Sequence, residues 1–213
     1  EVFHSSRWNH AHDRSGQRVA VIGTGASAIQ FVPEIQPKVA ELRVYQRTAH
    51  WVLPKPNGRF SRWGLALLRL PYAAQILRAL QYTGFETFGI GFRHPALLRQ
   101  AQKMGLALLR RQVRDPALRE RLTPNYTLGC KRVLLSNKWY PALTQPNVEV
   151  LSTGVKEVRG RTLVGADGSE REVDTIILGT GFHVIDQPGW NHIHGADGRS
   201  LDALTEVRTA EVG

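Results

Sequence analysis

The chain has 213 residues, with 28 lysines and arginines against 18 aspartates and glutamates, which gives a formal net charge of +10. This length is enough for one buried core, or for one domain and part of another. A single cysteine, Cys130, excludes an internal disulfide framework and favours a cytoplasmic protein. The longest apolar stretch, residues 63–82, contains Arg69, Pro71 and Arg78, which excludes a membrane span there.

The ends of the sequence predict an incomplete chain. Glu1 stands first, the only methionine is Met104, and no leader precedes the first apolar run. The positive charge suits phosphorylated ligands, nucleic acid or an anionic membrane surface. The same positive charge would result if the chain lacked terminal segments that carry the balancing acidic residues. We therefore expect an internal or truncated part of a longer protein.

A strand, a glycine-rich turn and a helix dominate the N-terminal part. Residues 19–22 form a continuous apolar run of the kind buried in parallel sheets. Gly23 would permit a tight turn, Gly25 would let a pyrophosphate approach the backbone, and Ala28 would keep helix and sheet close. The helix start would direct unpaired N–H groups at the phosphates. The predicted dinucleotide-binding turn consists of Gly23, Thr24, Gly25, Ala26, Ser27 and Ala28.

The helix and the next strand complete a Rossmann-like βαβ unit. Apolar residues continue at helical spacing to residue 35, and Pro33 is expected to kink or shorten the helix. Residues 42–47 are predicted to form the second strand. An NAD site places an acid about 20 residues beyond the glycines, whereas an arginine there suits a 2'-phosphate. Arg47 occupies this place, with Thr48 as a further hydroxyl contact, so we infer NADP(H).

Residues 58–128 are rich in leucine, alanine and arginine and predict a helical insertion. Helices are expected at 63–70, 72–82, 95–113 and 116–122, with Gly84, Gly89, Gly91 and Pro95 as breakers. No nucleic-acid-binding motif accompanies the cations, so a solvated face is favoured, and weak contact with a membrane surface stays open. The basic face would consist of Arg99, Lys103, Arg110, Arg111 and Arg114.

The C-terminal part returns to strands. Lys131 and Arg132 are adjacent cations, and on an extended backbone they would point to opposite faces and serve different ligands. Residues 174–182 predict a buried strand that ends in a glycine turn. The sequence after Gly181 would begin a new domain with a helix near its end. Further strands are expected at 148–151, 155–158, 162–164 and 170–173.

Four separated segments together resemble the Baeyer-Villiger type (class B) of flavin-dependent monooxygenase. His4–Trp8 is similar to the second half of that family's Phe-x-Gly-x-x-x-His-x-x-x-Trp fingerprint. The turn from Gly23 and the Gln46–Thr48 segment resemble its NADPH site. Gly129–Arg132 is the most specific match, and Asp174–Phe182 resembles an Ala-Thr-Gly-Phe return strand.

The resemblance implies roles for individual residues. Arg47 and Lys131 would hold the 2'-phosphate of NADPH, FAD would be the second cofactor, and Arg132 would be the catalytic residue over the flavin. NADPH would reduce the flavin, O2 would give a C4a-peroxyflavin, and a ketone would become an ester or lactone. The further cofactor-binding positions would be Gly179, Thr180 and Gly181. Gly179 stands where the family usually has alanine.

The resemblance also implies a division into domains. Residues 1–17 would be a linker between domains, 18–57 and 129–180 the NADP-binding domain, 58–128 the helical insertion, and 181–213 the incomplete start of the returning half of an FAD domain. The family's own FAD-binding glycine turn and its active-site acid are absent from this sequence. We therefore expect the isolated chain to be inactive and poorly folded at its C-terminal end.

Other readings stay open at this point. A flavin monooxygenase that oxidises nitrogen or sulfur shares the same plan, and a non-catalytic NADP-binding remnant or a nucleic-acid-binding module would fit the charge. A simple dehydrogenase is disfavoured, because Lys131 follows Tyr126 one position too late for a Tyr-x-x-x-Lys pair. The pairs His10-x-His12 and His192-x-His194 lack a third ligand with zinc-like spacing, so no metal is predicted.

Overall fold

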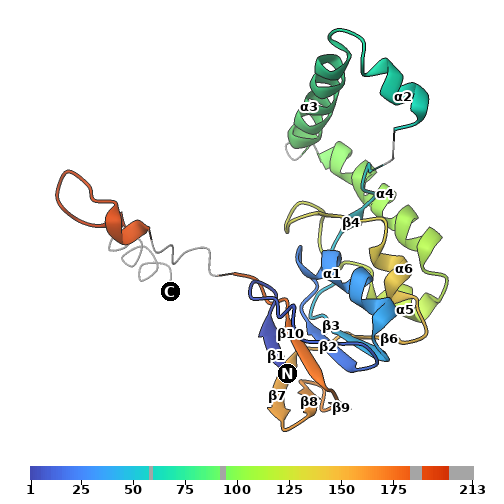
Figure 1. The fold of residues 1–213 in the computed structure, drawn as a ribbon, viewed down its shortest axis with the longest axis vertical. Helices are drawn as coiled ribbons and strands as arrows, with labels where there is room; N and C mark the ends of the chain where they lie inside the picture. Colours follow the sequence, from blue (N-terminus) through green and yellow to red (C-terminus); the bar gives the residue numbers. More distant parts are fainter. Residues whose placement is uncertain (58–59, 92–94, 183–188, 202–213) are drawn as a thin grey trace. The chain divides into compact units, whose positions relative to one another are not determined.

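A five-stranded parallel sheet forms the centre of the first of two units into which the chain divides, residues 1–180 and 181–213. The computed structural model describes residues 1–57, 60–91, 95–182 and 189–201. The strand order is β1-β10-β2-β3-β6, and each neighbouring pair runs parallel (Figure 1). These strands are β1 (Val2–His4), β2 (Arg18–Ile22), β3 (Glu41–Tyr45), β6 (Val148–Leu151) and β10 (Thr175–Leu178). The predicted α/β class is confirmed.

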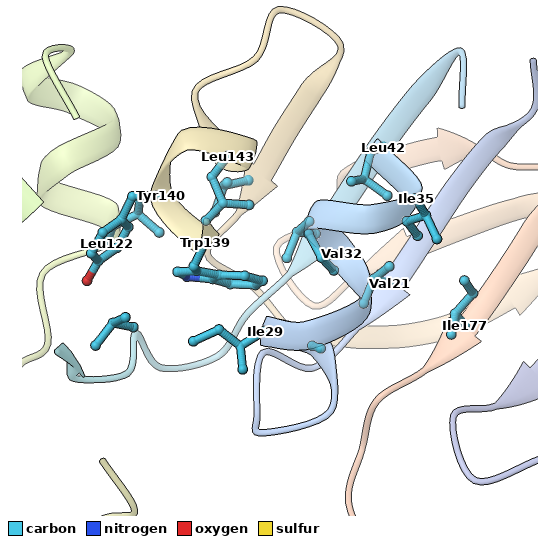
Figure 2. Packing of buried hydrophobic residues seen from close by; sticks show 14 of the residues in the cluster. Val21, Ile29, Val32, Ile35, Leu42, Leu122, Trp139, Tyr140, Leu143 and Ile177 are labelled. Carbon is cyan, nitrogen blue, oxygen red and sulfur yellow. The ribbon is translucent and has the colours of Figure 1, made fainter. Parts of the chain in front are cut away.

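Helix α1 (Ala28–Ile35) covers one face of this sheet with the apolar stripe that its periodicity predicts. Val32 is fully buried, and Figure 2 shows it between Val21 of the sheet and Trp139 of α6 (Trp139–Leu143). The helix has only eight residues and passes into a 3-10 turn, η1 (Gln36–Lys38). Pro33 lies inside the helix, which ends only at Ile35; Pro37, directly after the C-cap residue Gln36, lacks the N–H group that would continue it.

In the sequence, the segment between β6 and β10 forms a separate three-stranded antiparallel sheet. Its strands are β7 (Val155–Arg159), β8 (Thr162–Gly165) and β9 (Glu170–Glu172), in that order. Gly160 and Gly168 lie in its turns with positive φ angles of 59° and 81°. The hairpin and the Ala-Asp-Gly turn predicted from the sequence are therefore present.

The insertion is helical, as expected, but two of its predicted breaks are wrong. Helix α3 (Ala73–Gly91) continues through Gly84 and Gly89, where no neighbouring atom lies within 4 Å of an added Cβ. An interior glycine costs a helix only about 1 kcal/mol, so the surrounding helix-forming residues prevail. The other helices are α2 (Arg62–Leu67), α4 (Pro95–Gln112) and α5 (Pro116–Arg121).

Helix α4 connects this insertion to the site-bearing part of the unit. It buries Leu109 against the main core and packs Gly105 against Trp51, whose ring would lie 3.2 Å from an added Cβ. The five cations of the predicted basic face are all exposed, four of them in α4 and the fifth, Arg114, just after it. Among the described residues, no helix is long and apolar enough to cross a membrane.

The first strand was missed by the sequence analysis, which treated residues 1–17 as a linker. Val2–His4 pairs in parallel with β10 at the edge of the sheet, and Phe3 is buried there. Three residues in a polar surrounding carry too little periodicity to indicate a strand. The pairing partner lies more than 170 residues away and supplies the missing hydrogen bonds.

An ion-pair cluster fastens the start of β2 to the start of β10. Arg18 donates to the Asp174 carboxylate through Nε at 3.1 Å and Nη2 at 3.0 Å, and its backbone N–H donates at 2.9 Å. Arg161 also donates to this carboxylate. The hydrogen bonds from Arg18 are the main reason why the pKa of Asp174 lies well below its usual range. The carboxylate is thus charged in the folded protein throughout the neutral range.

We expect Asp174→Asn to lower the free energy of unfolding at pH 7 by about 1 to 2 kcal/mol, because charge-assisted hydrogen bonds are lost. The pKa of Asp174 is lower in the folded than in the unfolded protein. The ionised carboxylate therefore stabilises the fold fully at a pH above the unfolded pKa, about 3.9, and this stabilisation is lost as the pH falls below that value. Urea titrations between pH 7 and pH 3 measure both effects. Glu157→Gln, at an exposed pair with Arg159, is the control that should leave stability nearly unchanged.

The described part of the second unit is a short irregular segment. It contains a 3-10 turn, η2 (Trp190–His192), and an antiparallel bridge between His194 and Ser200, with Gly198 at φ 75° between them. The helix predicted near the end of the chain lies outside the described residues.

Candidate dinucleotide-binding site

Most of the predicted site residues follow the strands at one edge of the parallel sheet. Gly23 comes directly after β2, Gly179 directly after β10, and Arg47 stands two positions after β3. Because all these strands are parallel, their carboxyl ends meet at the same edge. Ligands of open parallel sheets bind in the crevice outside this edge. The fold therefore gathers residues that are separated by more than 150 positions in the sequence.

Two glycine turns lie against each other at this edge. Gly23 has φ 101°, and a Cβ added to it would come within 2.4 Å of the Gly179 carbonyl oxygen. Its N–H donates to the Tyr45 carbonyl at 3.0 Å, and the N–H of Gly179 donates to the Ile22 carbonyl at 2.8 Å. Glycine is thus required at position 23 by the backbone angle and by the neighbouring turn. An added Cβ at Gly179 would lie at an ordinary 3.4 Å from its nearest neighbour, so alanine would also fit there.

The turn after Gly23 presents unpaired donors. Within the described part of the chain, the backbone N–H groups of Gly25, Ala26 and Ser27 donate to no protein acceptor. Nothing lies within 4 Å of a Cβ added to Gly25, so the backbone is open there. The positive end of α1 points the same way, and no acidic residue occupies its first turn. Ala28 is fully buried and Thr24 nearly so. This turn fits a pyrophosphate.

We expect the two glycines of the turn to respond differently to alanine. Gly25→Ala should leave the free energy of unfolding nearly unchanged and weaken NADP+ binding about tenfold, because a methyl group fills the open space. Gly23→Ala should destabilise the fold by at least about 2 kcal/mol, because φ is positive and the Gly179 oxygen is too close. Urea unfolding and fluorescence titration with NADP+ separate the two effects. Equal loss of stability in both variants would contradict this assignment.

Arg47 follows β3 at the same edge of the sheet as the glycine turn. Its side chain is exposed, and the Cγ and Cδ atoms would lie 3.5 Å from a Cβ added to Gly154. In the described ranges no carboxylate pairs with its guanidinium group. Thr48 is half-buried next to it, and the preceding Gln46 is fixed by a hydrogen bond from its amide to the Arg121 carbonyl at 2.8 Å. An unpaired cation on a fixed backbone suits an anionic ligand.

The loop with the other two predicted cations is held mainly at its ends. Gly129 has φ 102°, and Lys131 and Arg132 are both exposed. The Lys131 ammonium lies 4.9 Å from the centre of the Tyr126 ring. No ion pair or hydrogen bond joins Arg132 to another residue of the described ranges. Arg132 is therefore accessible to a ligand and is not fixed by a protein partner.

A short parallel ladder brings this loop and Arg47 to one place. Strand β4 (Val52–Leu53) pairs in parallel with β5 (Leu134–Leu135). Arg47 precedes β4 and Lys131 precedes β5 by a few residues, so both enter the ladder from the same end. The ladder places Arg47 and Lys131 before the same end of β4 and β5, and their shared binding of one phosphate stays a prediction.

His50 was not singled out from the sequence. Its ring is half-buried, its Nδ1 atom is buried with no hydrogen-bond partner within the described part of the chain, and burial together with the charge of Lys131 keeps its pKa below the usual value. The side chain is therefore neutral at pH 7. Its position three residues after Arg47 gave no signal in the sequence, because only the folded loop brings it near Lys131.

The partial fingerprint His4–Trp8 lies over the start of α1. The Trp8 ring contacts Phe31 of α1 at a centroid distance of 5.1 Å and Phe3 of β1 at 5.3 Å, in an edge-on arrangement. Arg14 lies over the same ring at 5.0 Å. Trp8 thus packs the segment after β1 onto α1, which is a structural role.

Within the described residues, neither the histidine pairs nor other side chains form a metal site. No group of three or more histidine, cysteine, aspartate or glutamate side chains in the described residues is arranged to hold a metal ion. His12, from the first pair, bonds instead to the Thr175 hydroxyl at 2.8 Å. Cys130 is exposed and free.

Known proteins similar to this chain were found by sequence and by structure. A Baeyer-Villiger monooxygenase of Streptomyces coelicolor is 50% identical over 203 residues, which cover 94% of this chain and 39% of that relative. A Baeyer-Villiger monooxygenase of Pseudomonas aeruginosa is 45% identical, with 94% and 38% covered. The OTEMO complex with FAD and NADP has a TM-score of 0.75 at 25% identity and covers 97% of this chain and 47% of that structure. No protein-family model matches the chain. The chain therefore spans less than half the length of these relatives.

Proposed function

We propose that this chain, which is related over nearly its whole length to part of the Baeyer-Villiger monooxygenases, forms the NADPH-binding portion of an enzyme of that kind. The enzyme would use FAD, NADPH and O2 to insert one oxygen atom next to the carbonyl group of a small ketone, which gives an ester or lactone. The observation that carries this proposal is the glycine turn with unpaired N–H groups at a sheet edge that also bears Arg47. The single cysteine favours action in the cytoplasm.

The chain's own residues would bind and orient NADPH. The N–H groups of Gly25, Ala26 and Ser27 would donate to the pyrophosphate, and the helix end behind them would stabilise its charge. Arg47 and Lys131 would hold the 2'-phosphate from two sides, with Thr48 as an additional donor. The closed packing of Gly23 on Gly179 would fix this turn relative to the end of β10.

Arg132 would act at the oxygen-transfer step. FAD, when bound, supplies the activation of O2 after its reduction by NADPH. The guanidinium of Arg132 is always protonated and is accessible in the structure, so it would stabilise the negative charge that develops on oxygen next to the flavin. Gly179, Thr180 and Gly181 would line the approach of this cofactor after β10.

A steady-state assay of the full-length, FAD-loaded enzyme with isotopically labelled O2 tests the proposal, because the isolated chain is expected to be inactive. A ketone should stimulate NADPH oxidation, and one labelled oxygen atom should appear in the ester product. Oxidation of amines or sulfides in preference to ketones would favour a heteroatom-oxidising flavin monooxygenase. Binding of NADPH without reduction of added flavin would favour a non-catalytic NADP-binding protein.

A further inference from the structure

The ladder between β4 and β5 continues beyond the two strands through a side chain. The Leu134 N–H donates to the Trp51 carbonyl at 2.9 Å, and the Ser136 N–H donates to the Leu53 carbonyl at 3.0 Å. The next carbonyl in this period-two series belongs to Lys55. It accepts a hydrogen bond at 2.7 Å from Nδ2 of Asn137. The amide of Asn137 thus takes the place of a third backbone rung.

Asn137 makes two more contacts that fix the same segment. Its Oδ1 accepts from the Lys55 N–H at 3.0 Å, so the side chain pairs with both backbone groups of one residue. Its Nδ2 also donates to Oδ1 of Asn57 at 2.7 Å. A two-residue parallel pair is marginal by itself. Three bonds from one side chain therefore add a large part of the hydrogen bonding that holds these two segments in register.

The register of this ladder sets where Lys131 lies relative to Arg47, whose backbone is held at the end of β3 through Gln46. Arg47 and Lys131 stand before the same end of the ladder, and the loop of Lys131 has few bonds of its own. Within this loop, the backbone N–H of Cys130 donates a hydrogen bond to the Thr127 carbonyl at 3.1 Å. The aromatic contact with Tyr126 fixes only the end of the Lys131 side chain. The spacing between the two cations depends on the ladder.

We infer that Asn137 is a positioning residue that sets the spacing of Arg47 and Lys131, and thereby the discrimination between NADP+ and NAD+. This inference rests on the proposed NADPH site. Asn137 is exposed and follows β5, whereas Arg47 and Lys131 precede the two strands of the ladder. Asn137 would therefore touch neither the cofactor nor the reacting atoms. Its effect passes through the backbone of residues 51–55 and 131–136.

The test compares dissociation constants of NADP+ and NAD+ for the whole protein by fluorescence titration. Asn137→Ala should weaken NADP+ binding about fivefold, as expected for loss of hydrogen bonds that hold one of two charged ligands in place, and leave NAD+ binding unchanged. Asn137→Asp keeps the acceptor for Lys55 N–H and should give a smaller loss. Gln145→Ala, which removes an exposed amide bonded to the Pro141 carbonyl, is the matched control and should change neither constant.

A double-mutant cycle distinguishes positioning from general loosening. In a Lys131→Ala background, Asn137→Ala should have no further effect on NADP+ affinity, because the side chain it positions is gone. Additive losses, or an unchanged NADP+ to NAD+ ratio in Asn137→Ala, would overturn the inference. A wild-type protein without preference for NADP+ would overturn the proposed cofactor and this inference with it. If Asn137→Ala does not fold, Asn137→Asp carries the same cycle.

Discussion

In the FAD-loaded enzyme, Arg132→Ala should reduce formation of the oxygenated product at least 100-fold, while NADPH still reduces the flavin. Removal of one preorganised donor to a developing oxyanion lowers rates by about 100- to 1000-fold in other enzymes. The structure leaves Arg132 exposed, and the described residues offer it no ion pair, so the substitution removes no contact that supports the fold. Rapid-reaction spectroscopy measures flavin reduction, and chromatography measures the ester.

Two further variants sharpen this result. Arg132→Lys keeps a positive charge but loses the planar guanidinium, and we expect only partial recovery of product. Arg114→Ala removes an exposed cation that follows α4 and should behave as wild type. Ester formation at the wild-type rate by Arg132→Ala would show that this residue has no part in oxygen transfer. Loss of flavin reduction as well would assign it to NADPH binding instead.

Arg47→Ala should weaken NADP+ binding by about 10- to 100-fold and leave NAD+ binding nearly unchanged, because a charge-assisted hydrogen bond to a phosphate contributes about 1.5 to 3 kcal/mol. Arg47 has no carboxylate partner in the described ranges, so its charge is available to a ligand. Calorimetric or fluorescence titrations with both nucleotides measure the ratio. Raising the salt concentration should weaken wild-type NADP+ binding more than that of the variant.

Arg110→Ala is the control for this prediction. Arg110 is an exposed arginine in the last turn of α4, and its replacement changes the net charge by the same amount. It should leave both affinities unchanged. An Arg47→Ala protein with the wild-type ratio of the two affinities would exclude Arg47 as the residue that recognises the 2'-phosphate.

The sequence indicated the local elements of this fold because their causes are local. The apolar run 19–22, the helical spacing after Ala28 and the Ala-Asp-Gly turn each depend on residues that are neighbours in the chain. The strands and turn that they predict are present. The predicted helix breaks at Gly84 and Gly89 were wrong, because the low helix propensity of one glycine does not outweigh a long run of helix-forming residues around it.

Features that depend on distant partners were beyond sequence reasoning. Strand β1 exists because β10 offers it an edge, and the pKa of His50 is lowered because the folded chain buries its ring and brings the charge of Lys131 near it. The amide of Asn137 replaces a backbone rung only where Lys55 lies opposite, more than 80 residues earlier. The roles of Arg47, Lys131 and Arg132 in cofactor binding and catalysis stay predictions that the variants above test.

The contact between Gly23 and Gly179 has a consequence for the order of folding. In the sheet, β10 lies between β1 and β2, so the last of these five strands to be synthesised inserts between the first two. Until residue 179 emerges, the turn at Gly23 lacks the neighbour that packs against it. Contacts between positions so far apart are slow to form. A nascent chain stalled before β10 should therefore bind no nucleotide, and binding competence should arise only when synthesis passes this strand.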